Sequence, residues 1–380
     1  MPSSTSNFER IIPARPWRGM TVSVIMMLAV ATAAWEIYCR SLGYGPTLND
    51  SEDLWARIRR QVEPESIVII GDSRAVFDLD LDELEEGLGK RPLQLAQPGS
   101  CAYPVLHDFA KDTRFHGTII CSIVPRLFFA PPQAPPYGVA QNALKRYHDQ
   151  TYSRRFSLLL SMPLEEHVAF LKQDDLTLGQ LLDKLPIPNR PYALVPPKFP
   201  PYFATLDRER RARMTERCAQ PGPLQTRVKT GWIPLFSPPP PPTFIPHDAF
   251  IASMQRAIED RFHDIKSDVD LLRARDAKVL FVRLPVTLDL KALENQLTPR
   301  SAFWDRLLKE TAAPGVHFED YPELVSFDCP EWSHLSAGDS VEFTKRLAPH
   351  LRTALGPGRT AVTQCLRASP FVSPPRRMPR

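Results

Sequence analysis

The stretch Ser66-Ile67-Val68-Ile69-Ile70-Gly71-Asp72-Ser73 decides the fold class of this chain. Its consecutive β-branched residues, without polar alternation, are typical of a strand that is buried on both faces of a parallel sheet. The glycine that follows allows the chain to turn sharply where the strand ends. The stretch therefore predicts a buried strand with a serine at its carboxyl end.

Further strands and helices alternate along the chain. Short apolar runs predict strands at 92–96, 118–124, 278–283 and 315–318, and apolar spacings of three and four predict helices at 54–62, 79–87, 105–113, 250–275, 303–311 and 335–355. Strands that alternate with helices imply right-handed crossovers and a parallel sheet. We expect an α/β fold over residues 50–355, a three-layer α/β/α flavodoxin-like sandwich around a five-stranded parallel sheet.

Residues 131–246 interrupt this alternation. They contain about half of the chain's 41 prolines, including the run 238–242 and the proline-rich stretch 186–201. We interpret them as one long insertion, not a second domain, because their apolar residues are scattered between prolines. Helical patches are predicted at 164–172 and 206–218, and a polyproline II spacer at 238–242. We expect the sheet to form without this insertion.

The N-terminus indicates a membrane. Residues 19–39 carry no charge before Glu36, and about 20 helical residues span the roughly 30 Å of a bilayer core. Arginines precede the apolar run, so we expect residues 1–18 to be cytoplasmic and the domain beyond the span to lie outside the cytoplasm, anchored in the membrane. The alternative is a signal peptide cleaved at Ala31-Thr32-Ala33.

Composition narrows the class of protein further. The 380 residues include 47 Lys+Arg and 43 Asp+Glu, a net charge of +4, which is too balanced to suggest nucleic acid as a partner. The six cysteines show no metal-binding spacing, and we expect no metal or cofactor. In an oxidising compartment Cys101, Cys121, Cys218, Cys329 and Cys365 are available for disulfides. The Pro- and Arg-rich tail 356–380 is predicted to be disordered.

Two distant segments contain residues suited to nucleophilic catalysis. Ser73 follows the first strand, and Glu331-Trp332-Ser333-His334 precedes the last predicted helix. A histidine there can reach a serine at the first strand end, and an acid three residues earlier can hold the other ring nitrogen. Taken singly, Ser73 is compatible with a capped turn and His334 with a capping or surface residue.

These segments resemble the SGNH (GDSL-type) hydrolases. The resemblance is carried by Gly71-Asp72-Ser73, Gly99 and Glu331-x-x-His334, and covers roughly 66–125 and 278–355. It implies that Ser73 is the nucleophile, His334 the base and Glu331 its orienting acid. It also implies an oxyanion hole that includes the Ser73 N–H and Gly99.

The chain departs from that family in two places. Val124-Pro125-Arg126 stands where the family has Gly-x-Asn-Asp, so the side-chain oxyanion donor is missing unless Arg126 replaces it. The usual aspartate is Glu331, and Asp328 is an alternative orienting acid. Arg283 ends the fourth strand and is predicted to bind an anionic substrate group, with a structural salt bridge as the alternative.

The expected function is a membrane-anchored esterase or O-acyl transferase. The resemblance together with the anchor implies an acyl ester on an envelope polysaccharide as substrate and the lipid bilayer as a partner through residues 19–39. The main alternative is a non-catalytic envelope protein that keeps the fold for binding or assembly. A phosphate-binding module built on the 71–74 turn is a weaker alternative, because the turn has no glycine-rich run.

Overall fold

The core of the molecule is a parallel sheet of five strands, seen in a computed structural model that describes residues 16–172, 176, 178–183, 185, 202–238 and 246–356. Every neighbouring pair in this sheet is parallel. The order is β2 (Leu93–Gln94), β1 (Ile67–Ile70), β3 (Thr118–Ser122), β6 (Lys278–Arg283) and β7 (Gly315–His317). The predicted α/β class and five-stranded parallel sheet are therefore confirmed.

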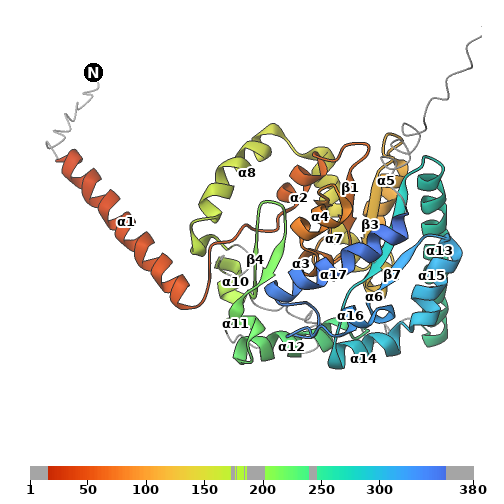
Figure 1. Cartoon of the computed structure of the whole chain (residues 1–380). Coiled ribbons are helices and arrows are strands. Elements are labelled where there is room, and N and C mark those ends of the chain that lie inside the picture. Colours follow the sequence, from red (N-terminus) through yellow and green to blue (C-terminus); the bar gives the residue numbers. More distant parts are fainter. Residues whose placement is uncertain are drawn as a thin grey trace, which may run out of the picture.

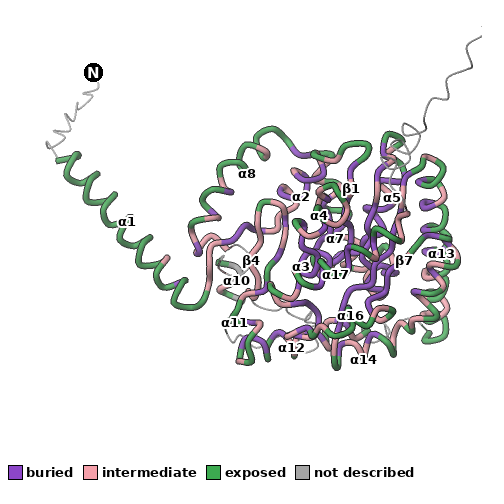
Figure 2. The backbone as a smooth tube through the Cα atoms, in the orientation of Figure 1, coloured by how far each residue is buried: buried purple, intermediate pink, exposed green. Residues whose placement is uncertain are grey.

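The two faces of the sheet carry separate hydrophobic cores, because successive side chains along a strand point in opposite directions. Ile69 and Ile120 belong to the first core, and Val68 and Cys121 to the second. The first core includes residues of α3 (Ser73–Asp78), α4 (Leu81–Leu88), α11 (Glu216–Ala219), α12 (Pro223–Phe236), α14 (Leu288–Leu297), η3 (Phe318–Asp320), α16 (Pro322–Val325) and α17 (Ala337–Leu355). The second includes residues of α2 (Glu52–Arg59), α5 (Tyr103–Lys111), α6 (Pro125–Phe128), α7 (Pro135–Asp149), α13 (His247–Arg273), η2 (Ser301–Asp305) and α15 (Arg306–Thr311). Helices thus cover both faces, and the strands between them are buried (Figures 1 and 2).

The prediction of a helix over 206–218 is wrong. The chain instead forms an antiparallel hairpin of β4 (Ala204–Leu206) and β5 (Ala212–Met214) before α11. The Asp207 carboxylate closes the turn by accepting the N–H groups of Glu209 at 2.9 Å and Arg211 at 3.0 Å. Arg210 has a left-handed φ of 63°, and its buried guanidinium pairs with Asp50. These contacts outweigh the local helical pattern.

The segment 131–246 supplies core residues, in contrast to the expectation that the sheet would form without it. Ala140 and Ala143 of α7 lie in the second core, whereas Val228 and Trp232 of α12 lie in the first. The segment also contains α8 (Tyr152–Glu165), η1 (Ala169–Leu171) and α10 (Leu178–Asp183), so the helix expected over 164–172 is the end of α8 followed by η1. The stretch 186–201 and the prolines 239–242 lie outside the described residues, as do residues 1–15 and the tail 357–380.

Helix α1 (Trp17–Ser41) projects from the domain (Figure 1) and is long and apolar enough to cross a membrane. Almost its whole length is exposed (Figure 2). Its C-terminal end is held by η1, because the Glu36 carboxylate accepts the N–H groups of Ala169 at 3.0 Å and Phe170 at 3.1 Å. Arg40 donates to the His167 carbonyl at 3.0 Å. Within the described residues, the helix is therefore joined to the domain at its C-terminal end.

Candidate active site

Ser73 begins α3 immediately after β1. The chain turns at Gly71, whose φ is 152°, and a Cβ at this position would lie 2.7 Å from the Ser122 Cβ. The buried Asp72 caps α3 by accepting the N–H of Arg74 at 2.9 Å. Ser73 itself remains half-buried. This turn accordingly leaves the serine hydroxyl at the carboxyl end of β1, the strand between β2 and β3.

The loop before α17 brings His334 and Glu331 to this hydroxyl. The Nε2 atom of His334 lies 2.8 Å from the Ser73 Oγ, and its Nδ1 atom lies 2.8 Å from the Glu331 Oε1. Glu331 also accepts the backbone N–H of His334 at 2.6 Å. A carboxylate can only accept, so the proton is on Nδ1 and Nε2 is free to accept from the serine. The structure thus joins Ser73, His334 and Glu331 in one hydrogen-bonded chain.

Aromatic side chains enclose the imidazole of the fully buried His334. Phe77 of α3 stacks on it with ring centroids 4.3 Å apart, and Trp232 meets it edge-on at 5.5 Å. Phe203 lies 5.9 Å away. The indole N–H of Trp232 donates to the second oxygen of Glu331. Sequence reasoning missed Phe203 and Trp232, because isolated aromatics in a proline-rich segment carry no motif.

The loop that carries Glu331 and His334 is fixed at several points. Trp332 has a φ of 82°, a conformation that a bulky residue adopts only where its surroundings impose it. The Trp332 carbonyl accepts the N–H of Thr287 at 3.0 Å, and the Asp78 carboxylate accepts the N–H of Leu335 at 2.9 Å. These bonds tie the loop to the start of α14 and to the end of α3.

Asp328, the alternative orienting acid, is exposed, and Glu331 occupies the Nδ1 position. Among the described residues, the side-chain hydrogen bonds of His334 are made with Glu331 and Ser73. A glutamate three residues before the histidine is long enough to fold back onto both the ring and the backbone of His334. The geometry therefore favours Glu331 over Asp328.

The predicted oxyanion and substrate residues have different surroundings. Gly99 has a φ of 65° and follows Gln97, whose N–H donates to the Gly71 carbonyl at 3.0 Å, so the turns after β1 and β2 are adjacent. Arg126, by contrast, donates to the Ser237 carbonyl at 3.0 Å, at the end of α12. Its burial lowers the pKa of its guanidinium. Arg126 thus connects α6, which follows β3, to the end of α12.

Arg283 belongs to a buried ionic cluster beneath the site. The Glu294 carboxylate pairs with both Arg283 and Arg74, and Arg283 also donates to the Ile123 carbonyl at 3.0 Å. Burial acts to raise the pKa of Glu294, but the two guanidinium charges outweigh it and lower that pKa from 4.5 to about 2. The structure gives Arg283 the salt-bridge role that the sequence left open as the alternative to substrate binding.

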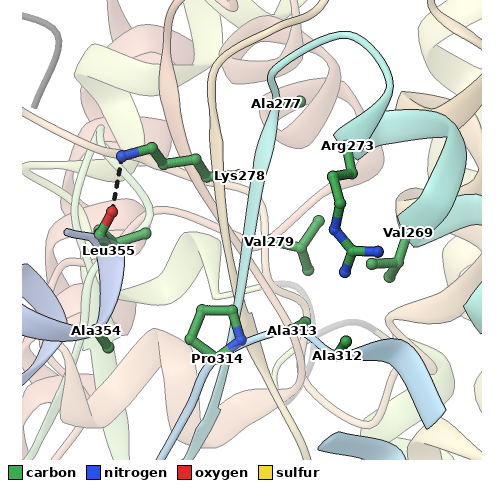
Figure 3. Close-up of a pocket in the computed structure, with 10 residues that line it drawn as sticks. All are labelled: Val269, Arg273, Ala277, Lys278, Val279, Ala312, Ala313, Pro314, Ala354 and Leu355. Atoms are coloured by element: carbon green, nitrogen blue, oxygen red, sulfur yellow. Dashed lines mark hydrogen bonds between the residues drawn. The ribbon is translucent and has the colours of Figure 1, made fainter.

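A hollow of about 250 Å³ lies at the opposite end of the sheet (Figure 3). Its lining includes Lys278, where β6 begins, and Pro314, just before β7. The Lys278 ammonium at its edge donates to the Leu355 carbonyl at 2.7 Å. Ligands of parallel α/β sheets bind outside the carboxyl ends of the strands, where Ser73 lies. This hollow is therefore not part of the candidate site.

The cysteines in the described ranges are free and buried: Cys39, Cys101, Cys121, Cys218 and Cys329. Burial raises the pKa of the Cys101 thiol to about 11 and that of Cys218 to about 12. Such thiols are poor nucleophiles. Cys365 lies outside the described residues. The candidate nucleophile of the site is consequently a serine.

No protein-family model matches this chain. No curated protein matches it either. The chemistry of the site is therefore argued from the contacts of Ser73, His334 and Glu331 themselves.

Proposed function

We propose that the chain is a serine-dependent acyl-transfer enzyme. The observation that carries the proposal is the chain of contacts from Ser73 to His334 to Glu331, with both ring nitrogens engaged at 2.8 Å. A serine hydroxyl is a weak nucleophile until an adjacent base accepts its proton. A base whose other nitrogen is held by a carboxylate is fixed in the tautomer required.

The proposed reaction has two steps. The Ser73 Oγ attacks an ester carbonyl while His334 Nε2 takes its proton; the tetrahedral intermediate then expels the alcohol, which takes that proton from His334. The acyl group is left on Ser73 as an ester. Water or an acceptor hydroxyl next attacks this ester, with His334 again taking the proton, which it returns to Ser73 Oγ as the acyl group leaves.

We propose backbone donors for the oxyanion, namely the N–H groups of Ser73 and Gly99. Pro125 has no N–H group, and Arg126 is engaged with Ser237. Loss of one oxyanion donor typically lowers the rate by about 10²–10³. We accordingly expect slow chemistry with simple esters.

More specifically, we propose an SGNH-type hydrolase or O-acyl transferase with a flavodoxin-like domain. The strand order supports this, since β2 lies at the edge beside β1 and the remaining strands follow in chain order. We further propose that α1 anchors it in a bacterial inner membrane with the domain on the outer side, and that the substrate is an acyl ester of an envelope glycan.

The alternative is a non-catalytic binding or assembly protein with the same fold. The missing side-chain donor after β3 favours it, because Val124-Pro125-Arg126 contains no asparagine and Arg126 donates to the Ser237 carbonyl at 3.0 Å. The two proposals differ in whether Ser73 is reactive.

A serine-directed fluorophosphonate distinguishes them in the full chain. We expect labelling of the wild type and of Ser253→Ala, a change at an exposed serine on α13. Ser73→Ala and His334→Ala should not label, and Asp328→Asn should label normally while Glu331→Gln labels slowly. A folded wild type that stays unlabelled after long incubation would support the non-catalytic alternative.

A further inference from the structure

Helix α8 presents an apolar face to its surroundings. Its large apolar side chains on one side are all more than half exposed, up to 86% for Tyr152. These residues, the α8 outer face, are Tyr152, Phe156, Leu159, Leu160 and Leu164. Their spacings of three and four place them together on one side of the helix. Contiguous exposed apolar residues of this kind mark an interaction surface.

The opposite side of α8 is already used for packing. Met162 and Leu158 lie against Leu48 and Leu54, in a small hydrophobic cluster of their own. The helix is also held by its N-cap, Thr151, whose hydroxyl accepts the N–H of Arg154. The inner side therefore fixes α8 on the domain, and the outer face is left without a partner among the described residues.

Helix α8 is joined by a short loop to η1, which contacts the C-terminal end of α1. It ends at Glu165, and the next ordered turn is η1, which binds Glu36. The loop between them supplies the His167 carbonyl that Arg40 holds. These contacts lie at the C-terminal end of the apolar span, where a membrane-crossing α1 leaves the bilayer. These contacts therefore hold the C-terminal end of α8, which carries Leu164, close to the membrane surface at which α1 leaves the bilayer.

The two helices run in different directions from this common point (Figure 1). Figure 2 shows that both are exposed along their outer sides. A helix that leaves a membrane span at an angle and carries an apolar face suits the boundary between head groups and acyl chains. Arg154 is exposed beside this face, and Arg155 lies over the Tyr152 ring, with its guanidinium carbon 5.2 Å from the centroid. Cations in this position suit anionic head groups.

We propose that the α8 outer face lies in the surface of the same bilayer that α1 spans. The domain would then be attached at two points, by the span and by an interfacial helix. One flexible attachment leaves a domain free to rotate, whereas two fix which side faces the membrane. The proposal requires that α1 is inserted, and it is independent of whether Ser73 reacts.

Spin labels in the reconstituted full chain test this. The chain with Cys365→Ser and either Phe156→Cys or Leu160→Cys is labelled and inserted into vesicles of phosphatidylethanolamine and phosphatidylglycerol. The buried native cysteines are poorly placed to react. A label at Lys345→Cys, on the exposed side of α17, is the matched control.

Oxygen concentrates in the acyl region of the bilayer, whereas the nickel chelate stays in water. We expect oxygen to increase the spin relaxation rate of labels at 156 and 160 several-fold more than the nickel chelate does. The control at 345 should show the reverse. Nickel access at 156 and 160 equal to that at 345 would overturn the proposal. Low access for both reagents would also overturn it, because a second copy or another protein would then cover α8. Leu164→Cys is an independent third position if either variant misfolds.

Discussion

At the scale of single residues, the geometry of the candidate site depends on a side chain that the motif does not contain. Trp232 donates its indole N–H to the carboxylate oxygen of Glu331 that does not face His334. Trp232 therefore helps to position Glu331, which in turn holds the imidazole of His334. Because 99 residues separate Trp232 from Glu331, only the tertiary structure brings them together.

Trp232→Phe should slow the reaction of Ser73 and leave the fold largely intact. Phenylalanine retains the aromatic packing but removes the donor, and a hydrogen bond to a charged group is worth about 1.5–3 kcal/mol. We expect the rate constant for fluorophosphonate labelling to fall by about tenfold or more. The matched control is Trp17→Phe in α1, which should not change that rate. An unchanged rate in Trp232→Phe would show that the indole serves packing alone.

The buried Glu294 should make the free energy of unfolding decrease as the pH falls. Its folded pKa of about 2 lies below the ordinary 4.5, because Arg74 and Arg283 favour the charged form. Its contribution is thus present above about pH 4.5 and is lost as the pH falls toward about 2. Glu294→Gln leaves two guanidinium groups without a counter-charge, so we expect it to be less stable by about 3–5 kcal/mol at neutral pH.

Urea unfolding of the detergent-solubilised chain at about pH 7 and about pH 3 measures this difference. The gap between wild type and Glu294→Gln should narrow in acid. At about pH 3 the carboxyl of the unfolded chain, with its ordinary pKa of 4.5, has taken up a proton, whereas folded Glu294, with a pKa of about 2, remains charged, so the wild type is less stable there than at about pH 7. Glu342→Gln, on the surface of α17, should show almost no gap at either pH. A gap for Glu294→Gln that stays constant would contradict the assigned pKa.

At the scale of elements, the sequence predicts what is local and periodic. The strands around Ile69, Ile120 and Leu280 are recognisable because they are buried on both faces, and that requires uninterrupted apolar runs. Ser73 is identifiable because it directly follows such a strand, and His334 because it precedes the amphipathic helix that ends the alternation. The hairpin at Arg210 was not predictable, since its turn is stabilised by a pairing with Asp50, 160 residues away. The contribution of α12 to the first core was not predictable either, because Val228 and Trp232 pack against residues that are distant in the sequence.

The inserted segment should therefore contribute to stability. Val228 of α12 is fully buried in the first core, whereas Val139 of α7 is 36% exposed. Both belong to the segment 131–246. We expect Val228→Ala to lower the free energy of unfolding by about 2 kcal/mol through the cavity it leaves. Val139→Ala should change it by less than about 0.5 kcal/mol. Equal, small effects would mean that the segment is not part of the cooperative core.

At the scale of the whole molecule, α1 is either a permanent membrane anchor or part of a signal peptide that is removed by cleavage. The C-terminal end of α1 has specific partners: Glu36 accepts N–H groups of η1, Arg40 donates to the His167 carbonyl just before η1, and Cys39 is buried. Cleavage after Ala33 would keep these contacts and remove the apolar span that precedes them. An uncleaved anchor would keep residues 19–33 in the membrane, whereas a cleaved signal peptide would lose them. In both cases the contact between the end of α1 and η1 would remain.

We expect the chain to remain in the membrane fraction after alkaline carbonate extraction, with a phosphatase fused to its C-terminus active on the outer side. The reason is the position of Arg10, Arg15 and Arg18 before the span, because positive residues are retained in the cytoplasm. Replacing these three arginines by glutamine should lower the phosphatase activity by weakening that preference. Release of the domain by carbonate would indicate cleavage. Equal activity of a cytoplasm-only reporter at the same fusion site would show that the domain is on the inner side, and in that case an envelope ester would be out of reach of Ser73.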